Sequence, residues 1–142
     1  MCSFRVGVVD GYGGGIGSTI VKKIKEYFSE DVEIIALGTN AIATSQMMKA
    51  GANKGATGEN AIVCNVQQVD VIIGSLGIVF AHGMMGEVTP KISEAIAASS
   101  ALKVLLPLTQ ENAKIVGVVE EPLPHLVERE VKIYIKEMIE NV

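Results

Sequence analysis

The sequence predicts an α/β fold, a three-layer Rossmann-like sandwich around a mostly parallel sheet of about five strands. Hydrophobic runs of strand length alternate with segments of helical spacing, which is typical of a sheet covered by helices. Hydrophobic residues make up 49% of the chain, as expected when helices bury both faces of a sheet. A length of 142 residues suits one domain over residues 1–142.

Five hydrophobic runs are the candidate strands: Phe4–Asp10, Val32–Leu37, Val69–Gly74, Leu102–Leu106 and Lys114–Val119. Only the seven residues 107–113 connect the last two, whereas a parallel crossover needs about a dozen. The fifth strand is therefore expected to be antiparallel, at the sheet edge. The strand order is either 2-1-3-4-5 or 3-2-1-4-5. We favour the first, because the long link after the second strand can cross back over the first.

Helices are expected between these runs. After the first strand, the apolar residues fall on one helical stripe from Ile16 to Phe28. A second helix is expected to begin at Thr39 or Asn40, as its cap, and to stop at Gly51. The remaining helices are expected over residues 58–66, capped by Thr57, over residues 90–99, and from Pro122 towards the end of the chain.

A glycine-rich loop follows the first strand, and five of its seven residues from Gly11 to Gly17 are glycine. A helix that begins at such a loop presents free N–H groups and the positive end of its dipole, which suit a phosphate. Alternatively, the glycines serve only a tight turn and close packing of the helix on the sheet. The loop contains no lysine, which argues against a Walker-type NTPase. The expected backbone donors are Gly11, Gly13, Gly14, Gly15 and Gly17.

Polar residues also follow the other strands of the predicted sheet. Thr39 and Asn40 are a candidate second anchor for the ligand, and Ser75 follows the third strand. Asp10, at the tip of the first strand, would repel a phosphate unless a cation intervenes. It is therefore expected to bind magnesium, to orient a substrate hydroxyl in catalysis, or to fasten its own turn.

His82 is a candidate general acid or base near Asp10, although a lone histidine in an apolar stretch is more often a hydrogen-bonded core residue. Thr57, in the string "GATGEN", is better explained by helix capping than by ligand binding. The two cysteines, Cys2 and Cys64, show neither a metal-ligand spacing nor a disulfide framework.

Several classes of partner and location are disfavoured. The net charge is −4 without a basic cluster and aromatic residues make up 4%, so nucleic acid is not an expected partner. The longest uncharged stretch, Val71–Gly86, is shorter than the about 20 apolar residues of a membrane-spanning helix. The N-terminus has no secretory layout, which predicts a cytoplasmic protein.

The glycine loop is similar to the glycine motif of the short-chain dehydrogenases, with Gly11, three residues, Gly15, Ile16 and Gly17. The likeness ends there, because no tyrosine is followed four residues later by the lysine of that family's catalytic pair. The second strand also ends without the acidic residue that would hold a ribose hydroxyl. A dinucleotide is therefore less favoured, although the neutral "GTN" at residues 38–40 suits a phosphate or a 2′-phosphate.

Three longer strings, "VVDGYGGGIG", "IIALGTNAIATSQMMKAGANKGATGENAIV" and "IIGSLGIVFAHGMMGEVTP", resemble a family of small bacterial proteins that is catalogued as a domain of unknown function. The resemblance runs along nearly the whole chain. It implies a Rossmann-like single domain and carries no functional residues with it, so function has to be argued from the site.

The leading hypothesis is a domain that binds a phosphorylated small metabolite or a nucleotide at the carboxyl edge of its sheet. The rival is a non-catalytic sensor or assembly protein, a homo-oligomer in which the apolar run Ile78–Met85 forms the subunit contact. A third, weaker reading is an oxidoreductase that uses NADP. The sequence predicts no particular reaction.

Overall fold

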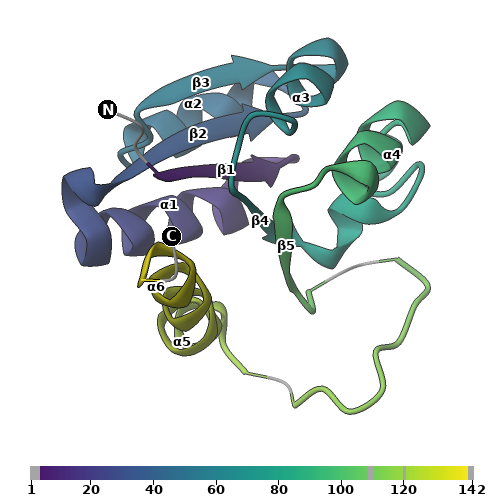
Figure 1. Cartoon of the computed structure of the whole chain (residues 1–142). Helices are drawn as coiled ribbons and strands as arrows, with labels where there is room; N and C mark the ends of the chain where they lie inside the picture. Colours follow the sequence, from purple (N-terminus) through teal and green to yellow (C-terminus); the bar gives the residue numbers. More distant parts are fainter. Residues whose placement is uncertain (1–3, 109–110, 120, 141–142) are drawn as a thin grey trace.

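The protein is built on one five-stranded sheet, described in a computed structural model over residues 4–108, 111–119 and 121–140 (Figure 1). All four strand pairs are parallel, and the spatial order is β3-β2-β1-β4-β5. The strands are β1 (Phe4–Asp10), β2 (Val32–Gly38), β3 (Lys54–Thr57), β4 (Val71–Ser75) and β5 (Leu102–Leu106).

Helices connect successive strands, and a helical segment follows the last one. They are α1 (Gly15–Phe28), the 3₁₀ turn η1 (Ser29–Asp31), α2 (Ala41–Lys49), α3 (Glu59–Asn65), the 3₁₀ turn η2 (Leu76–Val79) and α4 (Pro90–Ala98). The C-terminal segment consists of α5 (Leu123–Leu126), the π-helical turn η3 (Val127–Val131) and α6 (Lys132–Glu140).

Two hydrophobic cores lie on opposite faces of the sheet, which gives the predicted three layers (Figure 1). Alternate strand residues point to opposite faces, so Val8 of β1 belongs to one core and Val9 to the other. Residues of α1, α2 and the C-terminal helices share the core of Val8, and residues of α3 and α4 share that of Val9. Burial on both faces explains why the inner strands are continuous hydrophobic runs.

The predicted antiparallel fifth strand is wrong. Residues 114–119 form no strand, and Val116 and Val119 in this segment are exposed. The fifth strand is instead β3, which pairs parallel with the outer side of β2. Its four residues are mostly exposed, so they lack the apolar pattern that reveals a strand in a sequence. The other four predicted strands adopt the favoured order 2-1-3-4.

The helix ends agree with the sequence in part. Asn40 caps α2, because its side-chain oxygen accepts a hydrogen bond of 2.9 Å from the Ala43 N–H. Gly51 follows α2 with φ of +121°, as expected at a helix stop. The expected cap of α3 is wrong: Thr57 lies in β3, and Gly58, with φ of +99°, occupies the cap position.

The carboxyl ends of the strands meet at one edge of the sheet, and the direction of winding reverses between β1 and β4. The chain moves outward from β1 to β3, and then crosses back so that β4 lies on the other side of β1. In open α/β sheets, ligands bind at such a switch point. Of the helices in the described ranges, none is long and apolar enough to cross a membrane.

Candidate functional site

Asp10 fastens the glycine loop at the tip of β1. Its carboxylate is almost fully buried and accepts two backbone hydrogen bonds, from Gly11 N–H at 2.8 Å and from Gly17 N–H at 2.6 Å. The side chain therefore ties the end of the strand to the first turn of α1. Of the roles expected for Asp10, the structure shows hydrogen bonding to the backbone of its own turn.

Three of the five loop glycines are packed so tightly that an added side chain would force neighbouring atoms to move. A Cβ atom would lie 2.7 Å from Thr39 Oγ1 at Gly11, 2.9 Å from Ala43 Cα at Gly14, and 2.6 Å from the Met47 sulfur at Gly17. Gly14 also has φ of +76°, which disfavours other residues. These glycines provide the turn and the close helix packing that the sequence offered as an alternative to ligand binding.

Gly13 and Gly15 differ from their neighbours, because both are exposed and a Cβ atom at either position would meet no atom within 4 Å. Gly15 is the first residue of α1. The N–H groups of both residues donate to no acceptor within the described part of the chain. Backbone donors therefore remain available at the start of α1, next to open space.

Glu87, a residue that the sequence analysis missed, joins the glycine loop to the end of β2. Its Oε1 atom accepts three hydrogen bonds: from Tyr12 N–H at 3.0 Å, from Thr39 Oγ1 at 2.7 Å and from Asn40 Nδ2 at 2.8 Å. Thr39 and Asn40, the expected second anchor for a ligand, thus bind a carboxylate of the protein itself. No local pattern reveals this contact, because it joins residues 47 and 48 positions apart.

The two carboxyl groups differ in their pKa. Burial raises the pKa of Asp10 above its ordinary value; the Gly17 and Gly11 N–H groups oppose this, and the nearby charge of Glu87 adds to it. Burial also acts to raise the pKa of Glu87, but the hydrogen bonds from Thr39, Asn40 and Tyr12 outweigh it, so that pKa lies below its ordinary value. The two pKa values are thus shifted in opposite directions, that of Asp10 upward and that of Glu87 downward.

His82 lies in the loop between η2 and α4, is exposed, and has φ of +65°. It is therefore not the core residue that the sequence favoured, and it does not line the pocket described below. The apolar run that contains it is only partly buried: Ile78 and Met84 lie in the core shared with α4, whereas Met85 is exposed. A subunit contact over this run stays a prediction, with Met85 as its exposed large side chain.

The "GATGEN" string has structural contacts. The Thr57 hydroxyl donates to the Thr44 hydroxyl at 2.7 Å, and Glu59 accepts a hydrogen bond of 2.6 Å from the Thr89 hydroxyl. Cys64 is exposed, and its Sγ atom lies 3.9 Å from the Asn60 side-chain oxygen. Cys2 lies outside the described residues.

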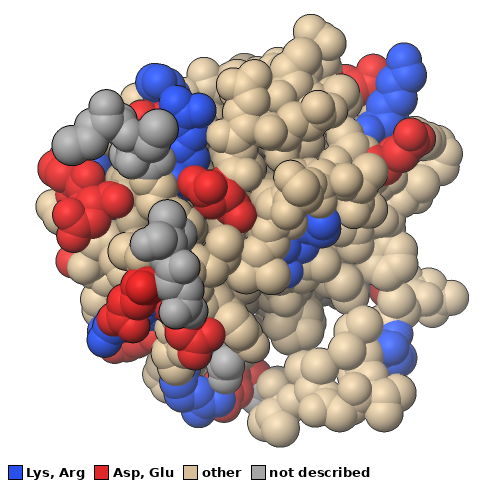
Figure 2. All heavy atoms as spheres, in the orientation of Figure 1, with Lys and Arg blue, Asp and Glu red and all other residues tan. Residues whose placement is uncertain are grey.

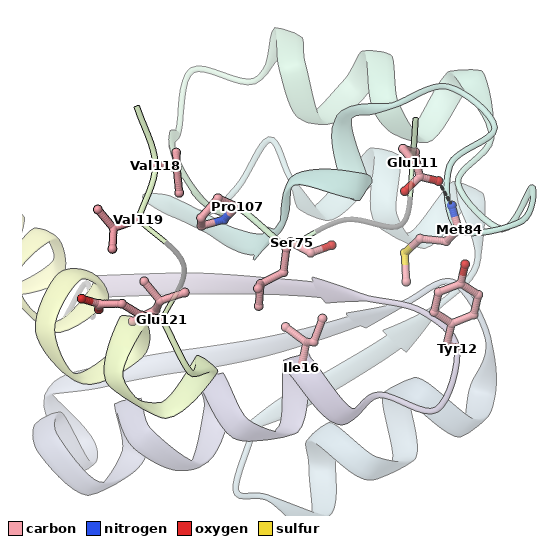
Figure 3. A pocket seen from close by; sticks show the side chains of 11 residues that line it. Tyr12, Ile16, Ser75, Met84, Pro107, Glu111, Val118, Val119 and Glu121 are labelled. Atoms are coloured by element: carbon pink, nitrogen blue, oxygen red, sulfur yellow. Dashed lines mark hydrogen bonds between the residues drawn. The ribbon is translucent and has the colours of Figure 1, made fainter. Parts of the chain in front are cut away.

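A pocket of about 490 Å³ opens at the switch point, between the glycine loop, the end of β4 and the segment after β5. Figure 3 shows Tyr12 and Met84 on one side of it, Val119 and Glu121 on the other, and Ser75 between them. The pocket is lined by Tyr12, Ile16, Ser75, Met84, Pro107, Leu108, Glu111, Val118, Val119, Glu121 and Leu126.

The pocket combines an apolar wall with a few polar groups. The Ser75 side chain is buried, yet its hydroxyl makes no hydrogen bond to any described residue. Glu111 Oε1 accepts a hydrogen bond of 2.7 Å from Met84 N–H, and Glu121 pairs with Arg129 at 2.6 Å. The other carboxylate oxygen of Glu121, Oε2, is buried without a hydrogen-bond partner. The polar side chains of the pocket thus carry two hydroxyls, of Ser75 and Tyr12, and two carboxylates, of Glu111 and Glu121.

Charged side chains are unevenly distributed over the surface. In the view of Figure 2, acidic and basic residues gather over the C-terminal helices and the neighbouring part of α1, whereas the segment after β5 carries few charges. No lysine or arginine lines the pocket. Within the described ranges, no group of three or more histidine, cysteine or acidic residues is placed to hold a metal ion.

The family described as "Domain of unknown function (DUF3842)" matches residues 5–139. The chain belongs to this family. The resemblance inferred from the three sequence strings is thereby confirmed. No curated protein sequence matches the chain. Among solved structures, the chain is similar to a universal stress protein crystallised in complex with cAMP, with 19% identity over 74% of this chain and 98% of that one, at a TM-score of 0.42.

The glycine loop follows β1, and β1 lies between β2 and β4, so the loop has one side towards β2 and one towards β4. The two sides differ in which hydrogen-bond donors are occupied. On the β2 side, the donors of Tyr12, Thr39 and Asn40 are already occupied by Glu87. On the β4 side, the Ser75 hydroxyl, which has no hydrogen-bond partner among the described residues, faces an open pocket next to Ile16 in the first turn of α1 (Figure 3). A ligand therefore finds unoccupied donors on the β4 side.

Proposed function

We propose that this DUF3842 protein binds the phosphate group of a nucleotide or sugar phosphate at the start of α1, with the rest of the ligand in the pocket beside Ser75. One observation carries the proposal: the exposed Gly13 and Gly15, whose N–H groups have no acceptor among the described residues, directly adjoin residues that line the pocket.

The start of α1 supplies the positive potential for a phosphate. The helix has 14 residues and no acidic residue of its own in its first turn. The Asp10 carboxylate accepts the Gly17 N–H and offsets part of the helix dipole, and the remaining positive potential acts at the N–H groups of Gly13 and Gly15. Because Gly13 and Gly15 carry no side chain and open space lies beside them, a phosphate oxygen can approach their N–H groups closely. The Ser75 hydroxyl adds a donor from β4.

The remainder of the pocket suits an uncharged part of the ligand that carries hydroxyl or amino groups. Ile16, Pro107 and Leu126 contribute an apolar wall on which a flat ring can pack. Glu111 and Glu121 contribute carboxylate oxygens, which accept hydrogen bonds from hydroxyl or amino groups and repel a second phosphate. A nucleoside phosphate has this combination, with its phosphate at one end and hydroxyl groups and a base at the other. We propose binding and assign no reaction.

The test is a thermal unfolding titration with 5′-AMP, ATP and ribose 5-phosphate, each with and without magnesium. Wild type is compared with Gly15→Val, whose side chain fits the space beside Gly15 and covers the donors. The control is Ala97→Val, which places the same valine side chain at an exposed position near the end of α4.

A probe at 100 times its dissociation constant is expected to stabilise wild type and the control by about 2.7 kcal/mol, and Gly15→Val by much less. The proposal fails if none of the three probes stabilises wild type. It also fails if Gly15→Val responds as strongly as wild type, because the ligand would then bind elsewhere.

A further inference from the structure

The β2 side of the glycine loop is shaped as an anion site that the protein fills itself. Three donors from two elements converge on one atom, Glu87 Oε1, at 2.7 to 3.0 Å. A backbone N–H, a hydroxyl and an amide are the donors that proteins commonly offer to phosphate oxygens. A Cβ atom at Gly11 would lie only 2.9 Å from Oε1, so the carboxylate fills the space in front of the loop.

The segment that carries Glu87 is held by its own hydrogen bonds. The His82 N–H donates to the Val88 carbonyl at 2.7 Å, and the Val88 N–H donates to the Gly83 carbonyl at 3.0 Å. The Glu87 N–H donates to the Met84 carbonyl at 3.1 Å. The next side chain, that of Val88, is fully buried. Glu87 is therefore presented by a fixed turn that is anchored in the core.

Glu87 leaves room for one kind of ligand group on this side. Its second carboxylate oxygen, Oε2, makes no hydrogen bond to any described residue, and Glu87 is only partly buried. That oxygen can accept a hydrogen bond from a hydroxyl, whereas a phosphate in the same place would meet a like charge. The second strand ends without an acidic residue that could bind a ribose hydroxyl. Glu87, from the loop before α4, places a carboxylate at that position in the folded protein.

We propose that Glu87 is a specificity-determining residue that closes the β2 side of the glycine loop to anions and admits a hydroxyl there. Within the proposed function, on which this inference rests, the single phosphate of the ligand is thereby directed to the β4 side. A ligand with a second phosphate near Thr39 and Asn40, such as a 2′-phosphorylated dinucleotide, is rejected.

The test uses inorganic phosphate as the probe and backbone amide NMR as the readout, so that each side of the loop is followed separately. Amides of Gly13, Gly15 and Ile16 report on the β4 side, and those of Tyr12 and Asn40 report on the β2 side. Wild type is compared with Glu87→Ala, with the milder Glu87→Gln, and with the control Glu94→Ala, which removes an exposed carboxylate from α4.

In wild type and Glu94→Ala, phosphate is expected to shift the β4-side amides alone. In Glu87→Ala, the β2-side amides are expected to shift as well, with an affinity at least about tenfold higher than in wild type. Formate, a small carboxylate, is expected to raise the melting temperature of Glu87→Ala and not that of Glu94→Ala, because it replaces the missing group. Glu87→Gln keeps the shape of the side chain and removes only its charge, so it is expected to show a smaller gain in β2-side affinity; it carries the test if Glu87→Ala does not fold.

Two results would overturn the inference: β2-side amides that respond to phosphate as strongly in wild type as in the Glu87 variants, or folded Glu87 variants that gain no phosphate binding there. Failure of the proposed function gives a different pattern, in which the β4-side amides of wild type do not respond. A gain on the β2 side of Glu87→Ala in that case still supports the role of Glu87.

Discussion

The Asp10 Oδ2 atom lies 2.6 Å from the Gly17 nitrogen, so the last residue of β1 holds the first turn of the helix that follows it. The other oxygen of the same carboxylate accepts the Gly11 N–H at 2.8 Å. One side chain therefore fixes both ends of the glycine loop. The two glycines left open, Gly13 and Gly15, lie between these two fixed points.

Asp10→Asn is expected to lower the free energy of unfolding by about 1–3 kcal/mol. Asparagine offers one acceptor oxygen, so its amino group faces one of the two N–H donors and leaves that donor unpaired in a buried place. Urea denaturation measures the change. Asp31→Asn, at an exposed position, is the control and should unfold as wild type does. An Asp10→Asn protein as stable as wild type would show that the two hydrogen bonds contribute little.

The stabilisation by Glu87 is expected to depend on pH. Because the pKa of Glu87 is lower in the folded protein than its ordinary value of 4.5, the stabilisation is present above that pH and is lost as the pH falls through the folded pKa. The destabilisation caused by Glu87→Gln should therefore be largest near neutral pH and shrink below about pH 4.5. Denaturation of both proteins between about pH 3 and about pH 7, a range that includes the ordinary pKa of carboxyl groups, checks this prediction.

Asp10 acts in the opposite direction, because its raised pKa makes the folded state less stable as the pH rises from its ordinary pKa of 3.8 through the folded pKa. Asp10 is present in both proteins of the comparison, so the difference between them reports on Glu87. A difference in stability that is constant over the whole range would contradict the role of the Glu87 charge.

Gly14→Ala and Gly15→Ala are expected to differ in sign. At Gly14, φ of +76° and the Ala43 Cα atom at 2.9 Å from a new Cβ make any side chain destabilising, by more than about 1 kcal/mol. At Gly15, a Cβ meets nothing within 4 Å, and alanine should stabilise the helix by about 0.4–1 kcal/mol. Chemical denaturation of the two variants, side by side, tests whether the loop glycines have separate roles; equal effects would show that they do not.

Ser75→Ala is expected to weaken ligand binding without loss of stability. Its hydroxyl makes no hydrogen bond to a described residue, so the free energy of unfolding should change by less than about 0.5 kcal/mol. One lost hydrogen bond to the ligand is worth about 0.5–1.5 kcal/mol, or up to roughly tenfold in affinity. Calorimetric titration with the best nucleotide probe gives the affinity. Unchanged affinity would place the ligand away from β4.

The parts of the fold that the sequence predicts are those whose residues are buried in regular patterns. Continuous apolar runs predict β1, β2 and β4, because both faces of these strands are covered by helices. The edge strand β5 is also predicted, since most of its residues are apolar and it is partly buried. The edge strand β3 is short and mostly exposed, so it leaves no such pattern. Conversely, residues 114–119 have the composition of a strand but pair with no strand in the structure.

Only the part of the site that is formed by residues close together in the sequence could be predicted. The glycine loop and Asp10 are adjacent in the sequence, and their hydrogen bonds join residues at most seven positions apart. Glu87 reaches Tyr12, Thr39 and Asn40 from 47 to 75 positions away, and Glu111 reaches Met84 across 27. Such contacts depend on the crossover between β3 and β4, which places distant loops at one edge of the sheet.

The segment after β5 forms one wall of the pocket, through Val118 and Val119, and its described residues 111–119 belong to no strand or helix. Changes in its length or composition therefore leave the sheet and the glycine loop intact, since surface loops tolerate insertions far better than the elements they connect. Under the proposed function, we expect relatives of this protein to keep the same phosphate-binding loop and to differ in ligand preference through this one segment. Exchanging it between family members offers a direct way to transfer ligand choice.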